Sequence, residues 1–269
     1  MHRRMCFRLL FFTFSSLLLS LAAFSQSQNP TPVRDPQAVS ILTQSLNAVG
    51  GLSVINAIQD YTSTGTITYN WTDQPVQCSV TLRGKGLSGF RMDATLPVGV
   101  QTLAVNGLSG RMKTADGQVK HLAAYNFVNA GSLSFPTLRL LSALSNQNVG
   151  LSLVGSVQAE GHQTDQVRAT FPVDPTLTAS VPIADLGTLD FFIDSTSFQL
   201  VKISENVRSE KDATVAYLHE VVYTNYQPVG GIAAPFGINE KIEGQQTWSI
   251  SVQSTSFNSG LSDSEFIIN

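Results

Sequence analysis

Apolar and polar side chains alternate with a period of two along most of the chain after residue 60. The clearest run has apolar residues at every second position, namely Val76, Cys78, Val80 and Leu82. Segments of this kind recur at intervals of roughly ten residues, as antiparallel strands joined by tight turns do. Asn106-Gly107 and Asp116-Gly117 stand between such segments. Both dipeptides suit type I′ turns, because the central residues of these turns need positive φ.

Two longer segments have helical spacing instead, and a short stretch at 52–59, with Leu52, Ile55 and Ile58 on one side, predicts a further short helix. Residues 36–49 carry one apolar stripe; Asp35 precedes them as an N-cap, and Gly50-Gly51 follows as a stop signal. Residues 134–147, "SFPTLRLLSALSNQ", interrupt the strand series with leucines at helical spacing and with Ser134 as a candidate cap. This second helix is more apolar than the stripe of a surface helix requires.

The whole pattern predicts an α+β, mostly β, single domain over residues 35–269. About 11 to 12 antiparallel strands rarely stay flat, because a twisted sheet of this size curls or closes. We therefore expect a strongly curved antiparallel sheet, an unclosed β-barrel, that is covered by helices. Residues 173–187 predict a long loop, since they carry neither period.

One hairpin departs from simple alternation. In "LDFFIDSTSFQLVKISE", residues 189–205, the apolar residues Phe191, Phe192 and Ile193 are consecutive. Both faces of this hairpin therefore carry apolar side chains, whereas a one-sided hairpin would alternate. One face can cover the domain core. The other fits a filled second layer or an internal cavity equally well, and the pattern does not distinguish them.

The N-terminus predicts a secretory signal peptide over residues 1–25. Basic residues precede the apolar run 9–24, and "AFS" at 23–25 places small residues at a cleavage site near Ser25. The alternative is an uncleaved anchor, but the run is shorter than the roughly 20 residues that span a bilayer. Residues 26–34 are a polar linker. We expect a periplasmic or secreted protein.

Charge and cysteine content argue against some classes of partner and against an intramolecular disulfide. Three of the 16 basic residues lie in the predicted signal, which leaves 13 against 19 acidic residues and a net charge of −6. This balance argues against a nucleic-acid partner and against electrostatic docking on anionic lipid. Cys78 is the single cysteine left after cleavage, so the mature chain cannot form an intramolecular disulfide. Its register with apolar neighbours favours a small core residue.

No catalytic or metal-binding pattern stands out, so we expect a protein that is not an enzyme and holds neither a cofactor nor a metal ion. The chain has no G-x-S-x-G elbow and no H-E-x-x-H motif. His121, His162 and His219 fall in separate segments, each typical of an exposed or hydrogen-bonded strand residue. Glu205 and Glu210 fit a solvated loop. Basic residues of one hairpin series predict a mild basic face: Arg83, Lys85, Arg91, Arg111, Lys113 and Lys120.

Several stretches together resemble the periplasmic lipoprotein-carrier superfamily, the LolA/LolB-like proteins that sort outer-membrane lipoproteins, in a divergent form. "DPQAVSILTQSLNAVGGLSVINAIQDYTSTGTITY" resembles the family's first helix, Gly-Gly stop and first strand. "GFRMDATLPVGVQTLAVNGLSGRM" resembles its arginine-bearing strand and the hairpin that follows. "FFIDSTSFQLVKI" and the series from "VVYTNYQPVGG" to "GLSDSEF" resemble its later strands. The family's aromatic after the Asn-Gly hairpin is missing here.

The resemblance implies a curved sheet whose helical lid encloses an apolar cavity for acyl chains. Arg91 aligns with a family arginine that ties the lid to the barrel, so the resemblance implies a lid contact there. Together with the doubly apolar hairpin, it predicts an apolar ligand-binding lining. We expect this lining to consist of Phe90, Met92, Leu138, Leu141, Phe192 and Trp248.

The leading hypothesis is an exported carrier or chaperone for lipid or lipoprotein acyl chains. Its partners would be acyl chains or a lipidated protein, an envelope protein and, transiently, a membrane; the chain would be a monomer. The alternative is a non-catalytic structural or interaction protein of the envelope with the same fold. An enzyme is the third class, and a hydrolase site invisible in the sequence is its strongest form.

Overall fold

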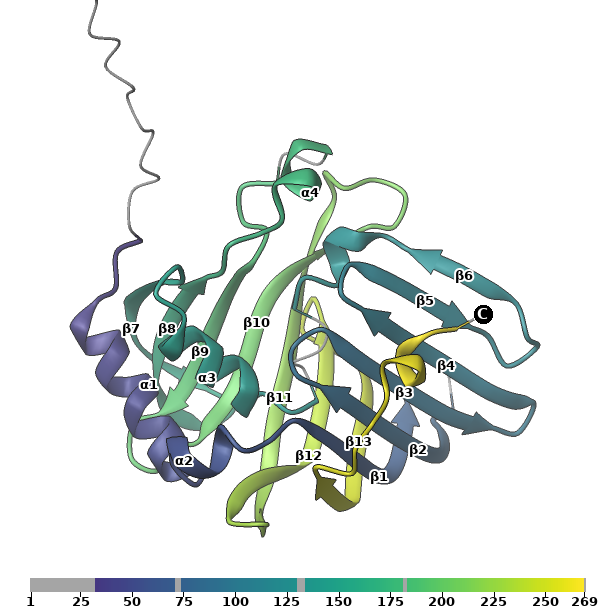
Figure 1. Ribbon diagram of the computed structural model, residues 1–269, viewed down its shortest axis with the longest axis horizontal. Helices are drawn as coiled ribbons and strands as arrows, with labels where there is room; N and C mark the ends of the chain where they lie inside the picture. The colour runs from purple at the N-terminus through teal and green to yellow at the C-terminus, as the bar shows by residue number, and fades with distance from the viewer. Residues whose placement is uncertain (1–31, 71–73, 130–133, 181–182, 269) are drawn as a thin grey trace, which may run out of the picture. The chain divides into compact units, whose positions relative to one another are not determined.

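The computed structural model describes residues 32–70, 74–129, 134–180 and 183–268. The predicted signal peptide and most of the predicted linker lie outside these residues. The unit Pro32–Asn269 forms one compact body (Figure 1). None of the helices in the described part of the chain combines the length and apolar character needed to cross a bilayer.

The bounds of the elements follow the predicted order closely. The helices are α1 (Pro36–Ala48), α2 (Leu52–Ile55), α3 (Thr137–Ser145) and α4 (Pro175–Ser180), and the 3-10 turns are η1 (Ala124–Asn126) and η3 (Asp263–Phe266). The strands are β1 (Asp60–Tyr69), β2 (Val76–Lys85), β3 (Gly89–Leu96), β4 (Gly99–Asn106), β5 (Ser109–Lys113), β6 (Val119–Leu122), β7 (Gly150–Ala159), β8 (His162–Thr170), β9 (Thr188–Asp194), β10 (Leu200–Arg208), β11 (Ala216–Val229), β12 (Ile232–Ile242) and β13 (Gln245–Phe257).

In the described residues, thirteen strands form one antiparallel sheet in the order β6-β5-β4-β3-β2-β1-β13-β12-β11-β10-β9-β8-β7. Within β1–β6 and within β7–β13, strands that follow each other along the chain lie side by side; the β1–β13 pair joins the two series, and β6 and β7 are the two edges. A bulge at Thr64/Gly65 bends this junction. A Cβ atom at Gly65 would lie 2.2 Å from the carbonyl oxygen of Ser251, so only glycine fits there. The prediction of a mostly β, curved and unclosed sheet is confirmed.

The α1 helix begins as the sequence predicts. The Asp35 side chain accepts a hydrogen bond from the backbone N–H of Gln37 at 2.8 Å, and Pro36 occupies the first turn. The apolar stripe is buried, with Leu42 and Leu46 fully covered. The element and its cap are therefore explained by the local sequence.

The α3 helix is held differently from the prediction. Its N-cap is Pro136 without a side-chain hydrogen bond, and the predicted cap Ser134 instead contacts the hydroxyl of Tyr61. Its C-terminal end is satisfied from outside the helix. The Arg34 guanidinium donates to the carbonyl oxygens of four residues, namely Ala143 (3.1 Å), Leu144 (2.6 Å), Asn146 (2.9 Å) and Val149 (2.8 Å). A cation at this end also complements the helix dipole.

The predicted loop 173–187 contains the short helix α4. The Asp174 carboxylate accepts hydrogen bonds from the backbone N–H and the hydroxyl of Thr176, at 2.8 and 2.6 Å. Six residues are too few to show a helical apolar stripe, which is why the period was not visible in the sequence.

The two longer helices cover one end of the sheet. Helix α1 packs against α3, the edge strand β7 and its neighbour β8, so both helices lie in front of the β7–β9 end (Figure 1). The side chains between these layers are almost completely buried: Leu42, Leu140, Leu151, Leu189 and Phe191. We call strands β7–β9 with α1 and α3 the helix-covered end.

The doubly apolar hairpin β9–β10 has a different partner on each face. Phe191 pairs in register with Val167 and Ile203, and all three are buried in the core. Phe192 points to the opposite face, because successive strand residues alternate. There the Lys202 ammonium lies 4.4 Å from the centre of the Phe192 ring and 2.6 Å from Glu220. The second apolar face is thus covered by a cation and its ion pair.

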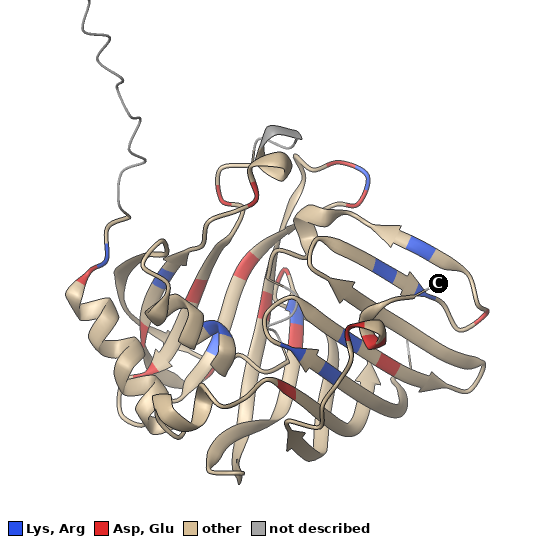
Figure 2. Cartoon of the chain, viewed as in Figure 1, with Lys and Arg blue, Asp and Glu red and all other residues tan. Residues whose placement is uncertain are grey.

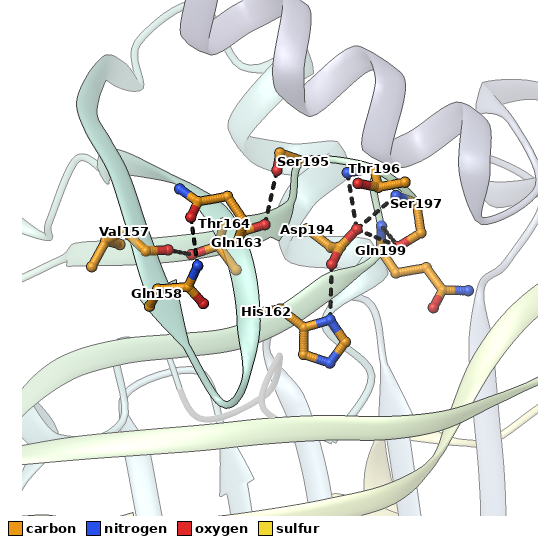
Figure 3. Close-up of polar contacts among 10 residues, drawn as sticks. All are labelled: Val157, Gln158, His162, Gln163, Thr164, Asp194, Ser195, Thr196, Ser197 and Gln199. Atoms are coloured by element: carbon orange, nitrogen blue, oxygen red, sulfur yellow. Dashed lines mark hydrogen bonds and ion pairs between the residues drawn. The ribbon is translucent and has the colours of Figure 1, made fainter.

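The turn of this hairpin is organised by one carboxylate (Figure 3). Asp194 Oδ1 accepts hydrogen bonds from the backbone N–H groups of Thr196 (2.9 Å) and Ser197 (2.6 Å). Its Oδ2 lies 2.8 Å from Nδ1 of His162 on the adjacent strand. These contacts, the Ser197 N–H first among them, lower the pKa of Asp194 to about 2.

Candidate functional site

An apolar cavity of about 430 Å³ lies on the inner face of the sheet away from the helix-covered end. Its floor is made by buried side chains of four strands, namely Tyr69, Leu82, Ile238 and Ile250. Its rim is made by half-buried apolar side chains, namely Leu103, Met112, Leu122, Ile242 and Trp248. The entrance of the cavity is therefore lined by partly exposed apolar side chains.

Strand register explains why these side chains meet. Leu82 pairs with Met92, Met92 with Leu103, and Leu103 with Met112. Directly paired residues of adjacent strands point to the same face, so this row crosses β2 to β5 on the cavity side. The sequence alternation that predicted the strands is therefore also what lines the cavity.

A short segment after β6 forms part of the cavity wall. We call residues Ala123–Asn129 the clasp. Asn126 accepts a hydrogen bond from the Arg208 backbone N–H at 2.7 Å and donates one to the Arg208 carbonyl at 2.8 Å. Glu210 accepts from the Ala123 backbone N–H at 2.6 Å. The clasp, which follows the edge strand β6, thus contacts the end of β10, although eight strands separate β6 from β10 in the sheet order.

Phe127 of the clasp packs directly on the backbone of β5. A Cβ atom at Gly110 would lie 2.3 Å from the Phe127 ring, so the ring occupies the space that glycine leaves open. Phe127 lines the apolar cavity. Glycine at this strand position is therefore explained by the close approach of a ring.

A buried charged cluster borders the cavity floor. On β11, Nε2 of His219 lies 3.1 Å from Glu240 and its Nδ1 lies 3.3 Å from Glu205. Glu240 also accepts a hydrogen bond from the hydroxyl of Thr247. Burial opposes the charge of His219, but the hydrogen bonds to the two carboxylates outweigh it and raise its pKa to about 10.

The cluster continues toward α3. Asn129 of the clasp donates to Glu205 at 2.6 Å, and its side-chain oxygen accepts from the Arg139 guanidinium. Arg139 also donates to the carbonyl of Val128 at 2.7 Å, and its guanidinium carbon lies 4.3 Å from the centre of the Phe171 ring. Hydrogen bonds thus link two carboxylates, one imidazolium and one guanidinium from the cavity to the helix.

The sequence interpretation of this cluster was partly wrong. Glu205, predicted to lie in a solvated loop, is a strand residue whose side chain is 10% exposed. His219 is a hydrogen-bonded strand residue, as the pattern favoured, and its neighbour Glu220 points to the other face. The cluster depends on the register of β10 with β11, which pairs Glu205 with His219. That register is a tertiary property.

The structure divides the predicted lining residues into two groups. Phe90, Met92 and Trp248 all line the apolar cavity. Leu138, Leu141 and Phe192 do not belong to its lining. The two leucines are on α3, where they pack against the core beside α1, and Phe192 points to the outer face beneath Lys202. The two leucines lie outside the cavity because α3 covers the other end of the sheet, whereas the clasp lines the cavity.

Arg91 lies on the outer face, next in sequence to the cavity residues Phe90 and Met92. It donates to Asp93 at 2.7 and 3.0 Å and to the backbone carbonyl of Glu265 in η3 at 3.0 Å. The predicted lid contact is therefore a contact with the C-terminal segment, which runs over β3 and β4. Strand alternation explains this outcome, because a residue between two cavity residues must face outward.

The predicted basic face is present except for Lys120, which pairs with Met112 and therefore lies on the cavity side of the sheet; the charge of the outer face is partly neutralised. Figure 2 shows Lys and Arg along β3, β5 and β6. Arg83 and Arg91 both bond Asp93, Lys85 pairs with Asp263 at 2.7 Å, and Arg111 donates to the Ile268 carbonyl at 2.6 Å. Much of this charge therefore fixes the C-terminal segment to the sheet. Among the described residues, no group of three or more His, Cys, Asp or Glu side chains is arranged to hold a metal ion.

Three solved structures share this fold over nearly their whole length. A LolA superfamily protein from Nitrosomonas europaea superposes with a TM-score of 0.53 at 12% identity, and 86% of this chain covers 97% of that one. A domain assigned as an outer membrane lipoprotein-sorting protein, from Vibrio parahaemolyticus, gives 0.52 at 10% identity, with 86% and 96% covered. A DUF1329 family protein from Desulfovibrio piger gives 0.51 at 11% identity, with 86% and 97% covered.

No family model and no curated protein sequence matches the chain. The structural likeness therefore establishes the fold, and the resemblance to LolA-like proteins that the sequence motifs indicated is confirmed at that level. The chain is a divergent example of the LolA-like fold.

Proposed function

We propose that the mature chain is an exported, non-catalytic carrier that shields an acyl chain of a lipid or a lipidated protein in the apolar cavity. The observation that carries this proposal is the cavity itself. Its volume of about 430 Å³ lies within the range of about 300–1,000 Å³ that is usual for small-molecule sites. Burial of an acyl chain there would stabilise the complex by about 0.8 kcal/mol for each CH₂ group that leaves water.

Two further features support the proposal. The relatives in fold include a domain assigned to lipoprotein sorting at the outer membrane, which fits an envelope location. The signal peptide expected over residues 1–25 would deliver the chain there. We propose Phe90, Met92 and Trp248 as ligand contacts, because they line the cavity from two strands, β3 and β13.

The direct test is mass spectrometry of organic extracts from the mature protein, purified from a periplasm without detergent. We expect one acyl lipid per chain. A fluorescent acyl probe with an uncharged head group then measures affinity. Met112→Glu places a carboxylate in the apolar row on the rim, and we expect about tenfold weaker probe binding, equivalent to about two lost CH₂ contacts.

The matched control is Leu141→Glu, the same change at a partly buried leucine of α3 outside the cavity. We expect this variant to bind the probe with an affinity within about twofold of that of the unaltered chain, a difference of less than ~0.5 kcal/mol. An empty extract together with equal binding by Met112→Glu and the unaltered chain contradicts the carrier proposal.

A specific observation favours one second candidate, an envelope interaction protein of the same fold. Edge strand β7 exposes Val154 (50%) and Val157 (37%), while residues 33–35 cover only its opposite end through a bridge at Leu151. An exposed apolar edge can pair with a strand of a partner. An empty cavity in the purified protein would favour this candidate, and Val154→Lys would then weaken the partner contact.

A further inference from the structure

A second hollow adjoins the cavity on the other side of the clasp. Its volume is about 300 Å³. Apolar side chains of the β2–β3 turn, the β4–β5 turn and the clasp form one part of its wall, namely Leu87, Leu108, Phe127 and Val128, and residues 172–174 form another. Phe127 lines both this hollow and the apolar cavity, so the two spaces meet at one ring.

Arg139 gives this hollow a buried cation. Its side chain lines the hollow, although the residue as a whole is only 6% exposed. Two of its hydrogen bonds go to oxygens of the clasp, at Val128 and Asn129. Its Nε has no hydrogen-bond partner within the described residues. A buried guanidinium N–H without a partner is costly, because its desolvation is not repaid.

The two other basic residues that line these spaces are already paired. His219 lies between Glu205 and Glu240, and Arg208 is paired with Asp185. No carboxylate of the described residues bonds Arg139 directly; its link to Glu205 passes through Asn129. Burial lowers the pKa of the Arg139 guanidinium to about 10 against the opposing effect of Glu205, so the group is still a cation at neutral pH.

We propose, resting on the carrier function above, that Arg139 binds the head of the ligand, and that this head is a singly charged oxyanion, a carboxylate or a phosphate diester. A guanidinium offers parallel N–H donors that match two oxygens of such a group. The acyl chain would lie in the apolar cavity and follow the Phe127 ring to the hollow. Asp174, which lies at the hollow, disfavours a doubly charged head.

The test compares ligands that share a chain and differ in the head. Dodecanoate carries a carboxylate, lauroyl lysophosphatidylglycerol carries a phosphate diester, and dodecanol carries no charge. We expect the unaltered protein to bind at least one of the two anions about tenfold more tightly than dodecanol, as one good charged hydrogen-bonded pair provides. The tighter anion identifies the source of the head group, and inorganic phosphate alone should not compete.

Arg139→Gln keeps a donor toward the clasp and removes the charge. We expect it to abolish the preference for the anion while dodecanol still binds. Arg168→Gln is the matched control, because this arginine is paired with Asp190 on the outer face, and the preference should persist. Arg139→Lys keeps the charge but removes the parallel N–H donors of the guanidinium, so it should retain part of the preference for the anion. This variant provides the test if Arg139→Gln does not fold.

The outcomes separate the two proposals. Failure of all three ligands to bind the unaltered protein contradicts the carrier function. Equal binding of dodecanol and both anions to the unaltered protein overturns the Arg139 proposal and leaves the carrier function standing. An anion preference that survives in Arg139→Gln, or that is lost equally in Arg168→Gln, also overturns the head-group assignment.

Discussion

The helix-covered end and the cavity end of this sheet are built from the same kind of alternating strand, yet one is filled and the other is hollow. At the first, two helices bring leucines such as Leu42 and Leu140 into contact with buried strand residues. At the second, the clasp contributes Phe127 and little else to the inner layer. The comparison teaches that strand pattern sets which face is apolar, whereas the covering element decides whether that face is packed.

The largest expected difference between the two ends is the cost of deleting a ring. Phe191 is fully buried at the helix-covered end, whereas Phe90 borders the cavity. We expect Phe191→Ala to lower the free energy of unfolding by about 4 kcal/mol and Phe90→Ala by about 2 kcal/mol, because a ring beside a hollow loses fewer contacts. Urea unfolding measures both. Equal losses would mean that the cavity end is packed as tightly as the other.

The next effect tests the cluster that joins the two ends. Removal of the imidazolium in His219→Gln leaves Glu205 and Glu240 buried without their cation, and we expect a loss of about 3 kcal/mol in the free energy of unfolding. The control His162→Gln removes a histidine whose side chain is 54% exposed and should cost much less.

The same cluster predicts a pH dependence. The folded pKa of His219, about 10, lies above its ordinary value of 6.5. Its contribution to stability is therefore complete below pH 6.5 and is lost as the pH rises toward 10. Thermal unfolding between pH 6 and 10 should show a decline that is absent in His219→Gln. A decline of the same size in the variant would assign it to other groups.

A smaller effect concerns the helix-covered end alone. Arg34→Ala removes the donor that satisfies four carbonyl groups at the end of α3, and we expect a loss of about 2 kcal/mol. Arg34→Lys should recover less than half of it, because an ammonium cannot span the same carbonyls. Lys85→Ala, at an exposed ion pair, should change stability by less than about 0.5 kcal/mol. A full recovery by lysine would contradict this account.

The smallest effect lies in the turn of the β9–β10 hairpin. Asp194→Asn weakens the acceptor of two backbone N–H groups, and we expect a loss of about 1 kcal/mol at neutral pH. Because the folded pKa of Asp194 is lowered to about 2 from 3.8, its contribution is present above pH 3.8 and is lost as the pH falls toward 2. On acid titration, Asp194→Asn should therefore begin to unfold at a higher pH than the control variant Asp212→Asn, in which the changed residue lies in an exposed turn. Unfolding of both variants at the same pH would contradict this account.

Much of the fold could be predicted because its signals are local. Asp35, Gly50-Gly51 and the alternation around Val80 identified α1 and β2 without tertiary information, and the structure confirms these elements. The α4 helix and the true partner of Ser134 could not be predicted. The first is too short to show a period, and the second depends on Tyr61, 73 residues away in the sequence.

The candidate site could be predicted only in part, for a related reason. Strand parity placed Phe90 and Met92 on one face, and the structure puts that face toward the cavity. The position of Leu141 depended on where α3 packs, and no local pattern contains this information. The cluster around His219 depends on the register of three strands, β10, β11 and β12, which a sequence without its fold does not reveal.

The strand order has a consequence for how the chain reaches its native state. Every sheet neighbour is also a neighbour along the chain, except where β1 meets β13; there Ser63 and Thr255, 192 residues apart, share a hydrogen bond. Hairpins within each series can form by closing short loops, which is fast, whereas the β1–β13 ladder must close a loop of nearly the whole domain. Its formation should limit the folding rate, and until it forms, two separate meanders expose the strand edges that the finished sheet hides.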